Sequence, residues 1–292
     1  MTAAAAQVGA DGAAPQTAPP PPGAIDAPLP PAMAARASDL GVSKADLDTT
    51  RTFLLAVLAG AFIALGAMFA TVVTAGAGDV PFGVARLAAG VVFCLGLLLV
   101  VAAGAELFTG NNLIVMAWAD RRVTLARLLR NWGIVYAGNL AGALATVLLV
   151  FAARQYEFGD GAVGLNALDI ANTKASLGWG QAVALGILCN ALVCMAIWLS
   201  YSARSLTDKF FAILLPISAF VAAGFEHSVA NMYFLPVGLL VKEGAAGSFW
   251  QTTGASADDY GDLTWTAAAL DNILPVTLGN VFGGSVMVGI VY

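Results

Sequence analysis

Hydrophobic residues along this chain gather into six long stretches, and shorter polar segments separate them. A helix rises 1.5 Å per residue, so about 20 apolar residues cross the roughly 30 Å hydrocarbon core of a bilayer. Each stretch is long enough for one crossing, and the pattern therefore predicts six transmembrane helices in an all-α membrane protein. The stretches cover residues 53–75, 85–118, 132–153, 179–201, 210–240 and 270–292.

The second and fifth stretches are too long for one straight helix, and polar residues interrupt both. The second contains Gly104-Ala-Glu-Leu-Phe-Thr-Gly-Asn-Asn112, and the fifth contains Gly224-Phe-Glu-His-Ser228. Irregular backbone at membrane depth survives only where protein or enclosed water satisfies its polar groups. We therefore predict that helices 2 and 5 are broken.

The two breaks stand at matching places in the two halves of the chain. Each half reads helix, broken helix, helix, and both breaks contain Gly-x-Glu. Three spans per half invert the second half relative to the first, so the pattern predicts an inverted repeat with its site between the halves. We expect Glu106 and Glu226 to be structural, accepting hydrogen bonds from backbone freed at the breaks.

Composition agrees with a protein whose solvent is the lipid bilayer. Hydrophobic residues make up 59% and charged residues 11% of the chain, whereas soluble domains carry about 25% charged residues. The net charge of −5 offers no basic face for nucleic acid. P-loop, GxSxG, HExxH and CxxC motifs are absent from the sequence, so we expect no enzyme activity, cofactor or metal.

The polar segments predict how the chain is organised around the membrane. The segment at residues 1–35 is rich in Ala and Pro, and this composition predicts a disordered tail. The transmembrane domain is predicted at residues 36–292. It begins with an amphipathic helix at 36–51, for which Ser43 is the predicted N-cap. Cytoplasmic loops of membrane proteins carry more Lys and Arg, and the counts here are nine against four, which predicts that both termini are cytoplasmic. The inside set is Arg36, Lys44, Arg51, Arg121, Arg122, Arg127, Arg130, Arg204 and Lys209, and the outside set is Arg86, Arg154, Lys174 and Lys242.

The single histidine, His227, follows Glu226 directly inside the fifth stretch. A charge at the bilayer centre costs about 2.5–3.5 kcal/mol on insertion scales and about 10–17 kcal/mol in simulations. If the helix breaks here, the next half-helix begins near Ser228, and its free N–H groups make an anion site. Thr109 adds a hydroxyl at the matching break, so these residues are candidates for binding an anion.

An anion that crosses such a site meets an electrostatic barrier. Moving a carboxylate into a medium of low dielectric constant costs on the order of 20 kcal/mol, whereas protonating a simple carboxylate at pH 7 costs about 5 kcal/mol. A narrow apolar constriction should therefore pass a neutral acid more readily, and His227 could lend and recover the proton. Candidates for the constrictions are Phe93, Leu97 and Leu107 on one side and Val193 and Phe220 on the other.

The two break sequences, Gly104–Leu113 and Gly224–Met232, resemble the signature motifs of the formate/nitrite transporter family. The resemblance extends over residues 40–292 and is greatest to the formate channel branch. It implies an aquaporin-like protomer of six helices, a homopentamer with one pore per protomer, and formate as the substrate. Glu106 and Gly110 depart from the aspartate and serine that the family more often has.

The resemblance also implies roles for individual side chains. His227 would be the central histidine, Thr109 the loop threonine, and Lys174 a vestibule lysine that attracts anions. The remaining implied positions are a cytoplasmic constriction of Phe93, Leu97 and Leu107 with Phe108 nearby, a periplasmic constriction of Val193 and Phe220, and polar pore residues Asn190, Asn231 and Asn280.

Two other functions stay open at this point. The same fold could pass nitrite or hydrosulfide in place of formate. The protein could also be a membrane docking or regulatory subunit for a formate-metabolising enzyme. In each case we expect a multi-pass protein of the bacterial inner membrane.

Overall fold

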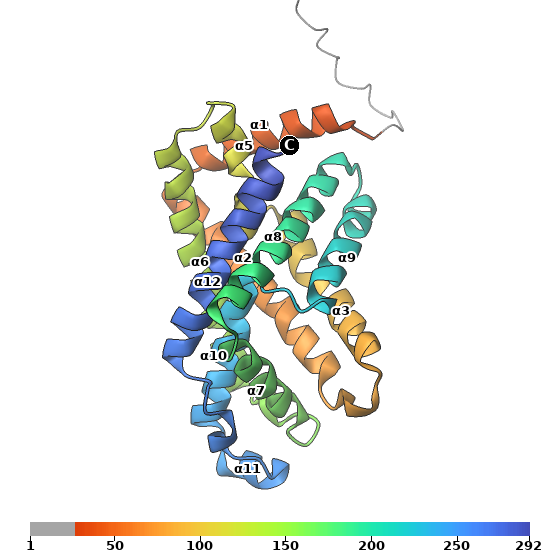
Figure 1. The fold of residues 1–292 in the computed structure, drawn as a ribbon, viewed down its shortest axis with the longest axis vertical. Coiled ribbons are helices and arrows are strands. Elements are labelled where there is room, and N and C mark those ends of the chain that lie inside the picture. The colour runs from red at the N-terminus through yellow and green to blue at the C-terminus, as the bar shows by residue number, and fades with distance from the viewer. Residues whose placement is uncertain (1–26) are drawn as a thin grey trace, which may run out of the picture.

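Residues 27–292 are described by a computed structural model, and in this range the chain is helical without a strand. The helices run mostly along the long axis of the molecule (Figure 1). Five of them are long and apolar enough to cross a membrane, and they agree with five of the six predicted stretches. These are α2 (Thr49–Thr74), α3 (Phe82–Ala103), α6 (Leu125–Ala152), α8 (Trp179–Ser202) and the run Ala267–Ile290, in which α12 (Leu274–Val281) lies between two segments of π-helical turns.

The fifth stretch forms two helices, α9 (Leu206–Ala222) and α10 (Ser228–Gly244), of 17 residues each. Each is shorter than a full crossing, so the structure has five complete spans and a sixth hydrophobic region that is divided. In the second stretch, α3 is followed by a short non-helical segment and then by α4 (Phe108–Asn111) and α5 (Ile114–Ala119). Both predicted breaks are confirmed.

Each break begins at a glycine with left-handed backbone. Gly104 has φ 67° and Gly224 has φ 75°. Residues with a Cβ atom rarely adopt this conformation, and glycine after a helix is the common way to end it. The glycine of each Gly-x-Glu motif is therefore the residue that stops the first half-helix.

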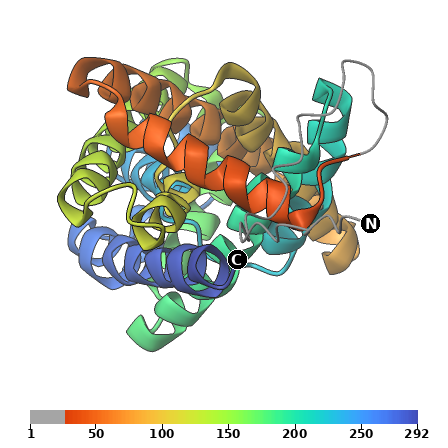
Figure 2. The ribbon, with the colours of Figure 1, turned by 90° about the horizontal axis from the view of Figure 1, so that it is seen from above.

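The segment before the first span differs from its prediction. α1 (Pro30–Asp46) lies across one end of the bundle (Figure 2). It begins at Pro30, because proline at the first helical position loses no hydrogen bond. Ser43 is inside this helix, where its Oγ donates to the Asp39 carbonyl, so its prediction as an N-cap is wrong. The cap that follows is Asp48, whose Oδ1 accepts from Arg51 N at 2.9 Å.

The prediction of a disordered tail at residues 1–35 falls mostly outside the described residues, which begin at 27. Within the described part, α1 starts at Pro30, before the predicted boundary at residue 35. The C-terminal end of the chain lies near α1 in Figure 1, while α7 (Ala162–Ala175) and α11 (Gly247–Thr253) lie at the opposite end.

Glycine lets α2 and α6 approach closely. A Cβ atom on Gly142 would collide with the Val57 carbonyl oxygen and lie 2.9 Å from Ala61 N. Small residues at helix contacts allow this close packing in membranes. Gly133, on the same helix, has open space where its Cβ would be.

We expect Gly142→Ala to destabilise the protein by about 1–3 kcal/mol, because the added methyl group overpacks the contact between α2 and α6. To measure this effect, the purified protein would be heated, and the fraction that still elutes as folded protein would be recorded at each temperature. Gly133→Ala is the matched control, and we expect it to be neutral or to stabilise by about 0.5–1 kcal/mol. Equal effects of the two substitutions would contradict the prediction.

Candidate functional site

Side chains from neighbouring helices satisfy the backbone at the first break. Glu106 N donates to the Leu55 carbonyl at 3.2 Å. Asn139 on α6 accepts from Phe108 N at 2.9 Å through its Oδ1, and its Nδ2 donates to the carbonyls of Ala56 and Glu106. One asparagine therefore joins both sides of the break to α2.

The second break has the same set of hydrogen bonds. Glu226 N donates to the Leu185 carbonyl at 3.3 Å. Asn280 accepts from Ser228 N at 2.9 Å, and its Nδ2 donates to the carbonyls of Gly186 and Glu226. The predicted inverted repeat is thus visible in individual hydrogen bonds.

A buried glutamate at each break forms an ion pair. Glu106 is 3% exposed, and its Oε1 lies 2.6 Å from Lys44 Nζ, while its Oε2 accepts from Asn111 Nδ2 at 2.6 Å. Asn111 also donates to Asn131 Oδ1 at 2.9 Å. A buried carboxylate needs both a partner charge and hydrogen bonds, and this one has both.

Glu226 repeats this arrangement in the second half. It is 4% exposed, its Oε1 lies 2.7 Å from Lys174 Nζ, and its Oε2 accepts from Asn231 Nδ2 at 2.7 Å. Asn231 also donates to Asn272 Oδ1 at 2.7 Å. Lys174, predicted as the attractor of anions, is thus held in an ion pair, and Asn231 belongs to the support of Glu226.

His227 and Thr109 break the symmetry of this scaffold. When Glu106 is set against Glu226, the counterpart of His227 is Leu107 and the counterpart of Thr109 is Val229. The structure brings the two polar residues together, with His227 Nε2 and Thr109 Oγ1 3.0 Å apart and both side chains buried. The site therefore has one polar pair, built from both halves of the repeat.

The hydrogen bonds of His227 define its tautomer. Ala230 N donates to His227 Nδ1 at 3.0 Å, so His227 caps the N-terminus of α10. Since Nδ1 accepts, the single proton of a neutral imidazole lies on Nε2 and is donated to Thr109 Oγ1. A second proton would place an N–H on Nδ1 against the Ala230 N–H and break the cap.

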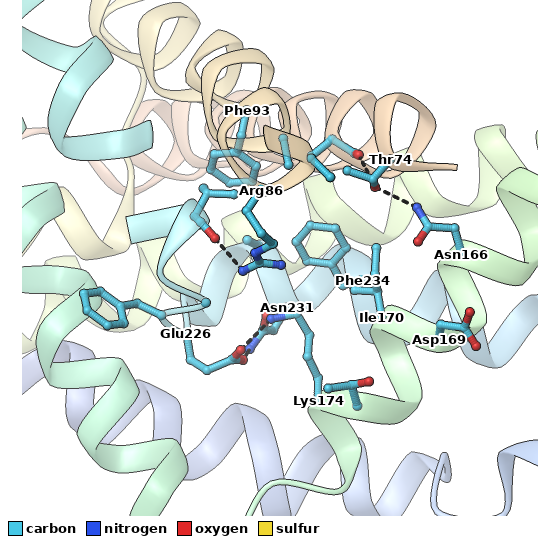
Figure 3. Close-up of a pocket in the computed structure, with 18 of the residues that line it drawn as sticks. Thr74, Arg86, Phe93, Asn166, Asp169, Ile170, Lys174, Glu226, Asn231 and Phe234 are labelled. Atoms are coloured by element: carbon cyan, nitrogen blue, oxygen red, sulfur yellow. Dashed lines mark hydrogen bonds and ion pairs between the residues drawn. The ribbon is translucent and has the colours of Figure 1, made fainter. Parts of the chain in front are cut away.

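A cavity of about 820 Å³ is lined by residues of α7, such as Asn166 and Lys174 (Figure 3), and by His227. Phe93 and Phe220 both line it, with ring centroids 5.6 Å apart in an edge-to-face arrangement. The Phe220 ring stacks on His227 at 5.9 Å. The aromatic pair and the histidine therefore stand together at one part of the cavity wall.

Phe93 faces Phe220 and lines the cavity with it. Its grouping with Leu97 and Leu107 in one constriction stays a prediction. The other predicted constriction residues are buried in the same apolar cluster but do not line this cavity. They are Leu97, Leu107, Phe108 and Val193.

Asn190 connects the two breaks from α8. Its Nδ2 lies 2.7 Å from Asn112 Oδ1, 2.7 Å from the Asn280 carbonyl and 3.3 Å from the Thr109 carbonyl. Asn190 and Asn280, both predicted as polar pore residues, are fully buried. Their contacts hold the backbone on which Thr109 and His227 stand.

Sequence reasoning missed four polar residues of the site. Lys44 and Arg86 carry charge, and Asn131 and Asn272 complete the two glutamate networks. The repeat itself held a signal for the asparagines: Asn131 and Asn139 are eight residues apart, as are Asn272 and Asn280. Eight residues are close to two helical turns, which places each pair on one face.

Comparison with known proteins gives one consistent result. The family model described as "Formate/nitrite transporter" matches residues 31–292. The chain is 46% identical over 264 residues to the formate channel FocA of Escherichia coli strain K12, covering 90% of this chain and 93% of that one. It is 39% identical to the formate channel FocA of Haemophilus influenzae, covering 87% and 89%.

Solved structures agree with these relatives. A structure titled "Pentameric formate channel with formate bound" matches with a TM-score of 0.81 and 46% identity, covering 84% of this chain and 96% of that one. A second, titled "FNT family ion channel", matches with a TM-score of 0.73 and 26% identity, covering 89% and 97%.

Proposed function

This chain belongs to the formate/nitrite transporter family, and from that premise we propose that it is a membrane channel for small monovalent anions, with formate as its main substrate. The formate channels that it resembles match nearly the whole chain. The function is transport, with no chemical conversion of the substrate beyond the gain or loss of a proton.

The observation that carries this proposal is the His227–Thr109 pair behind the cavity. A small anion beside the aromatic rings of Phe93 and Phe220 meets a neutral donor pair. The Thr109 hydroxyl hydrogen is free to donate, and the His227 Nε2–H, which donates to Thr109 Oγ1 in the empty site, can turn to the anion. Donors fixed by the fold stabilise an anion without the reorganisation that water would need. The dipole of α10 adds a partial positive charge at the same place, because its N-terminus lies at His227.

We infer that the cavity opens to the periplasm of a bacterial inner membrane. The Lys and Arg excess lies at the end that holds α1, and cytoplasmic segments carry this excess. Both ends of the described chain then lie on the cytoplasmic side. The solved relative is pentameric, and we infer the same homopentamer for this chain, with the large exposed apolar side chains, such as Leu149 and Leu215, facing lipid or a neighbouring protomer.

Two modes of passage follow from the geometry. In the first, formate crosses as an anion that accepts hydrogen bonds from His227 Nε2–H and Thr109. In the second, formate leaves as the neutral acid after taking a proton. This second mode requires His227 to become charged first, which costs its cap on Ala230 N. In the empty site His227 stays neutral, because only the neutral ring can cap Ala230 N. An anion beside the ring stabilises the charged form and so favours the second mode.

The test is stopped-flow uptake by proteoliposomes across a series of pH values. We expect formate flux at least tenfold above empty liposomes, with nitrite and hydrosulfide slower than formate. If the flux of nitrite or hydrosulfide exceeded that of formate, that anion would be the main substrate of the same channel. Flux equal to that of empty liposomes for all three anions would contradict a channel and favour a docking or regulatory subunit.

A further inference from the structure

Arg86 is a cation of the cavity wall that sequence reasoning did not single out. It lies near the start of α3, is half-buried and lines the cavity beside Phe93 (Figure 3). Its Nε donates to the Ala222 carbonyl at 3.2 Å and its Nη2 to the Val221 carbonyl at 2.5 Å. These are carbonyls from the last turn of α9, so one edge of the guanidinium caps that helix.

The charges that line the cavity do not all remain available to an anion. Lys174 is paired with Glu226 at 2.7 Å, so their formal charges cancel. His227 is hydrogen-bonded as a neutral ring. Asp169 is exposed, which lets water screen its negative charge. Arg86 is the cation on this wall whose hydrogen-bond partners are uncharged carbonyls.

The guanidinium keeps donors that no protein group uses. An arginine has five N–H groups in a planar fork, and the acceptors of Arg86 among residues 27–292 are the two carbonyls of α9. The Nη1 group therefore has no protein acceptor within that range. A planar fork with free N–H groups matches the two oxygens of a carboxylate.

We propose that Arg86 is an anion-binding residue of the cavity, which holds a small monovalent carboxylate before it reaches the Phe93–Phe220 pair. This inference rests on the proposed function and adds an entry site to it. The entry site is separate from the His227–Thr109 pair. In this arrangement Lys174 neutralises Glu226 at the break, and Arg86 concentrates the anion.

The test compares formate flux in proteoliposomes carrying Arg86→Gln, Arg86→Lys or the wild-type sequence. Glutamine keeps a donor for an α9 carbonyl but removes the charge. We expect Arg86→Gln to raise the half-saturating formate concentration about fivefold and to leave the maximal flux within about twofold of wild type. The half-saturating concentration should also depend less on ionic strength than in the wild type. Arg86→Lys keeps the charge without the fork, and we expect a rise of about twofold.

Lys242→Gln is the matched control. Lys242 is a partly buried cation whose Nζ also donates to two backbone carbonyls, those of Tyr260 and Leu263, but it does not line the cavity. We expect its loss to leave the half-saturating concentration unchanged. A shift as large as that of Arg86→Gln, or no shift in Arg86→Gln itself, would overturn the proposal.

Failure of a variant to assemble and failure of the wild type to transport formate have different consequences. If Arg86→Gln does not assemble, Arg86→Lys decides, and an unchanged half-saturating concentration in that variant would also overturn the proposal. If the wild-type protein carries no formate, the proposed function fails before the entry site is tested. The two failures are therefore distinguishable.

Discussion

His227→Leu is expected to reduce formate flux by about 10- to 100-fold, the largest functional effect among the predictions. Leucine removes the Nε2–H donor that lies 3.0 Å from Thr109 Oγ1. A hydrogen bond to a charged group is worth about 1.5–3 kcal/mol, and every 1.4 kcal/mol changes a rate or an equilibrium constant tenfold. Leucine also cannot cap Ala230 N, and a lost cap costs about 1 kcal/mol of stability.

His227→Asn separates hydrogen bonding from proton transfer. Asparagine is a good helix cap and carries donors, but it does not titrate. We expect flux within about tenfold of wild type. If His227 relays protons, the pH dependence of that flux should flatten in this variant. A pH profile identical to that of the wild type would exclude the relay and leave His227 as a fixed donor.

Thr109 provides the matched control on the other half of the repeat. Thr109→Ser keeps the hydroxyl beside His227, whereas Thr109→Val removes it at nearly constant volume. Stopped-flow flux should therefore fall in Thr109→Val and stay close to wild type in Thr109→Ser. Equal flux in both variants would contradict a role for the hydroxyl in holding the anion.

The breaks could be predicted because their signals are local. A left-handed glycine, a buried carboxylate and a following helix start all occur within five residues at Gly104 and again at Gly224. The duplication of this pattern gave the inverted repeat. The amphipathic helix predicted at residues 36–51 was misplaced because Ser43 is a residue type that often caps helices, while the proline pair at Pro30 begins the helix earlier.

The partners of the buried glutamates could not be predicted, because they come from distant parts of the chain. Lys44 is 62 residues from Glu106, and Lys174 is 52 residues from Glu226. Hydropathy places both lysines in polar segments outside the spans, where a free charge is the simplest interpretation. Only the packing of α1 and α7 against the two breaks places those charges on the carboxylates.

The contact between Phe93 and Phe220 could not be predicted from the sequence either. Phe93 and Leu97 lie on one face of α3, so sequence spacing groups them together. The edge-to-face contact of Phe93 with Phe220 depends on how α3 meets the end of α9. A pattern within one helix cannot report which neighbouring helix each turn of it contacts.

Lys174→Met is expected to destabilise the folded protein by about 3–5 kcal/mol, the largest effect on stability. Methionine has a similar length but no charge, so the substitution leaves Glu226 buried, 4% exposed, and without its counter-ion. Breaking one side of a buried ion pair costs this much because the remaining charge is uncompensated. Loss of folded protein during heating in detergent would measure the effect.

The double variant Lys174→Met/Glu226→Gln tests the cause. Glutamine still accepts from Asn231 Nδ2 but leaves no buried charge, so we expect it to recover at least half of the lost stability. The repeat supplies a second comparison in Lys44→Met, which removes the counter-ion of Glu106. The Lys44 side chain is 29% exposed and that of Lys174 is 15% exposed, so water can take the place of Lys44 more readily than that of Lys174, and the loss should be smaller. If the double variant were no more stable than Lys174→Met alone, the packing of the lysine stem, and not the charge of Glu226, would account for the loss.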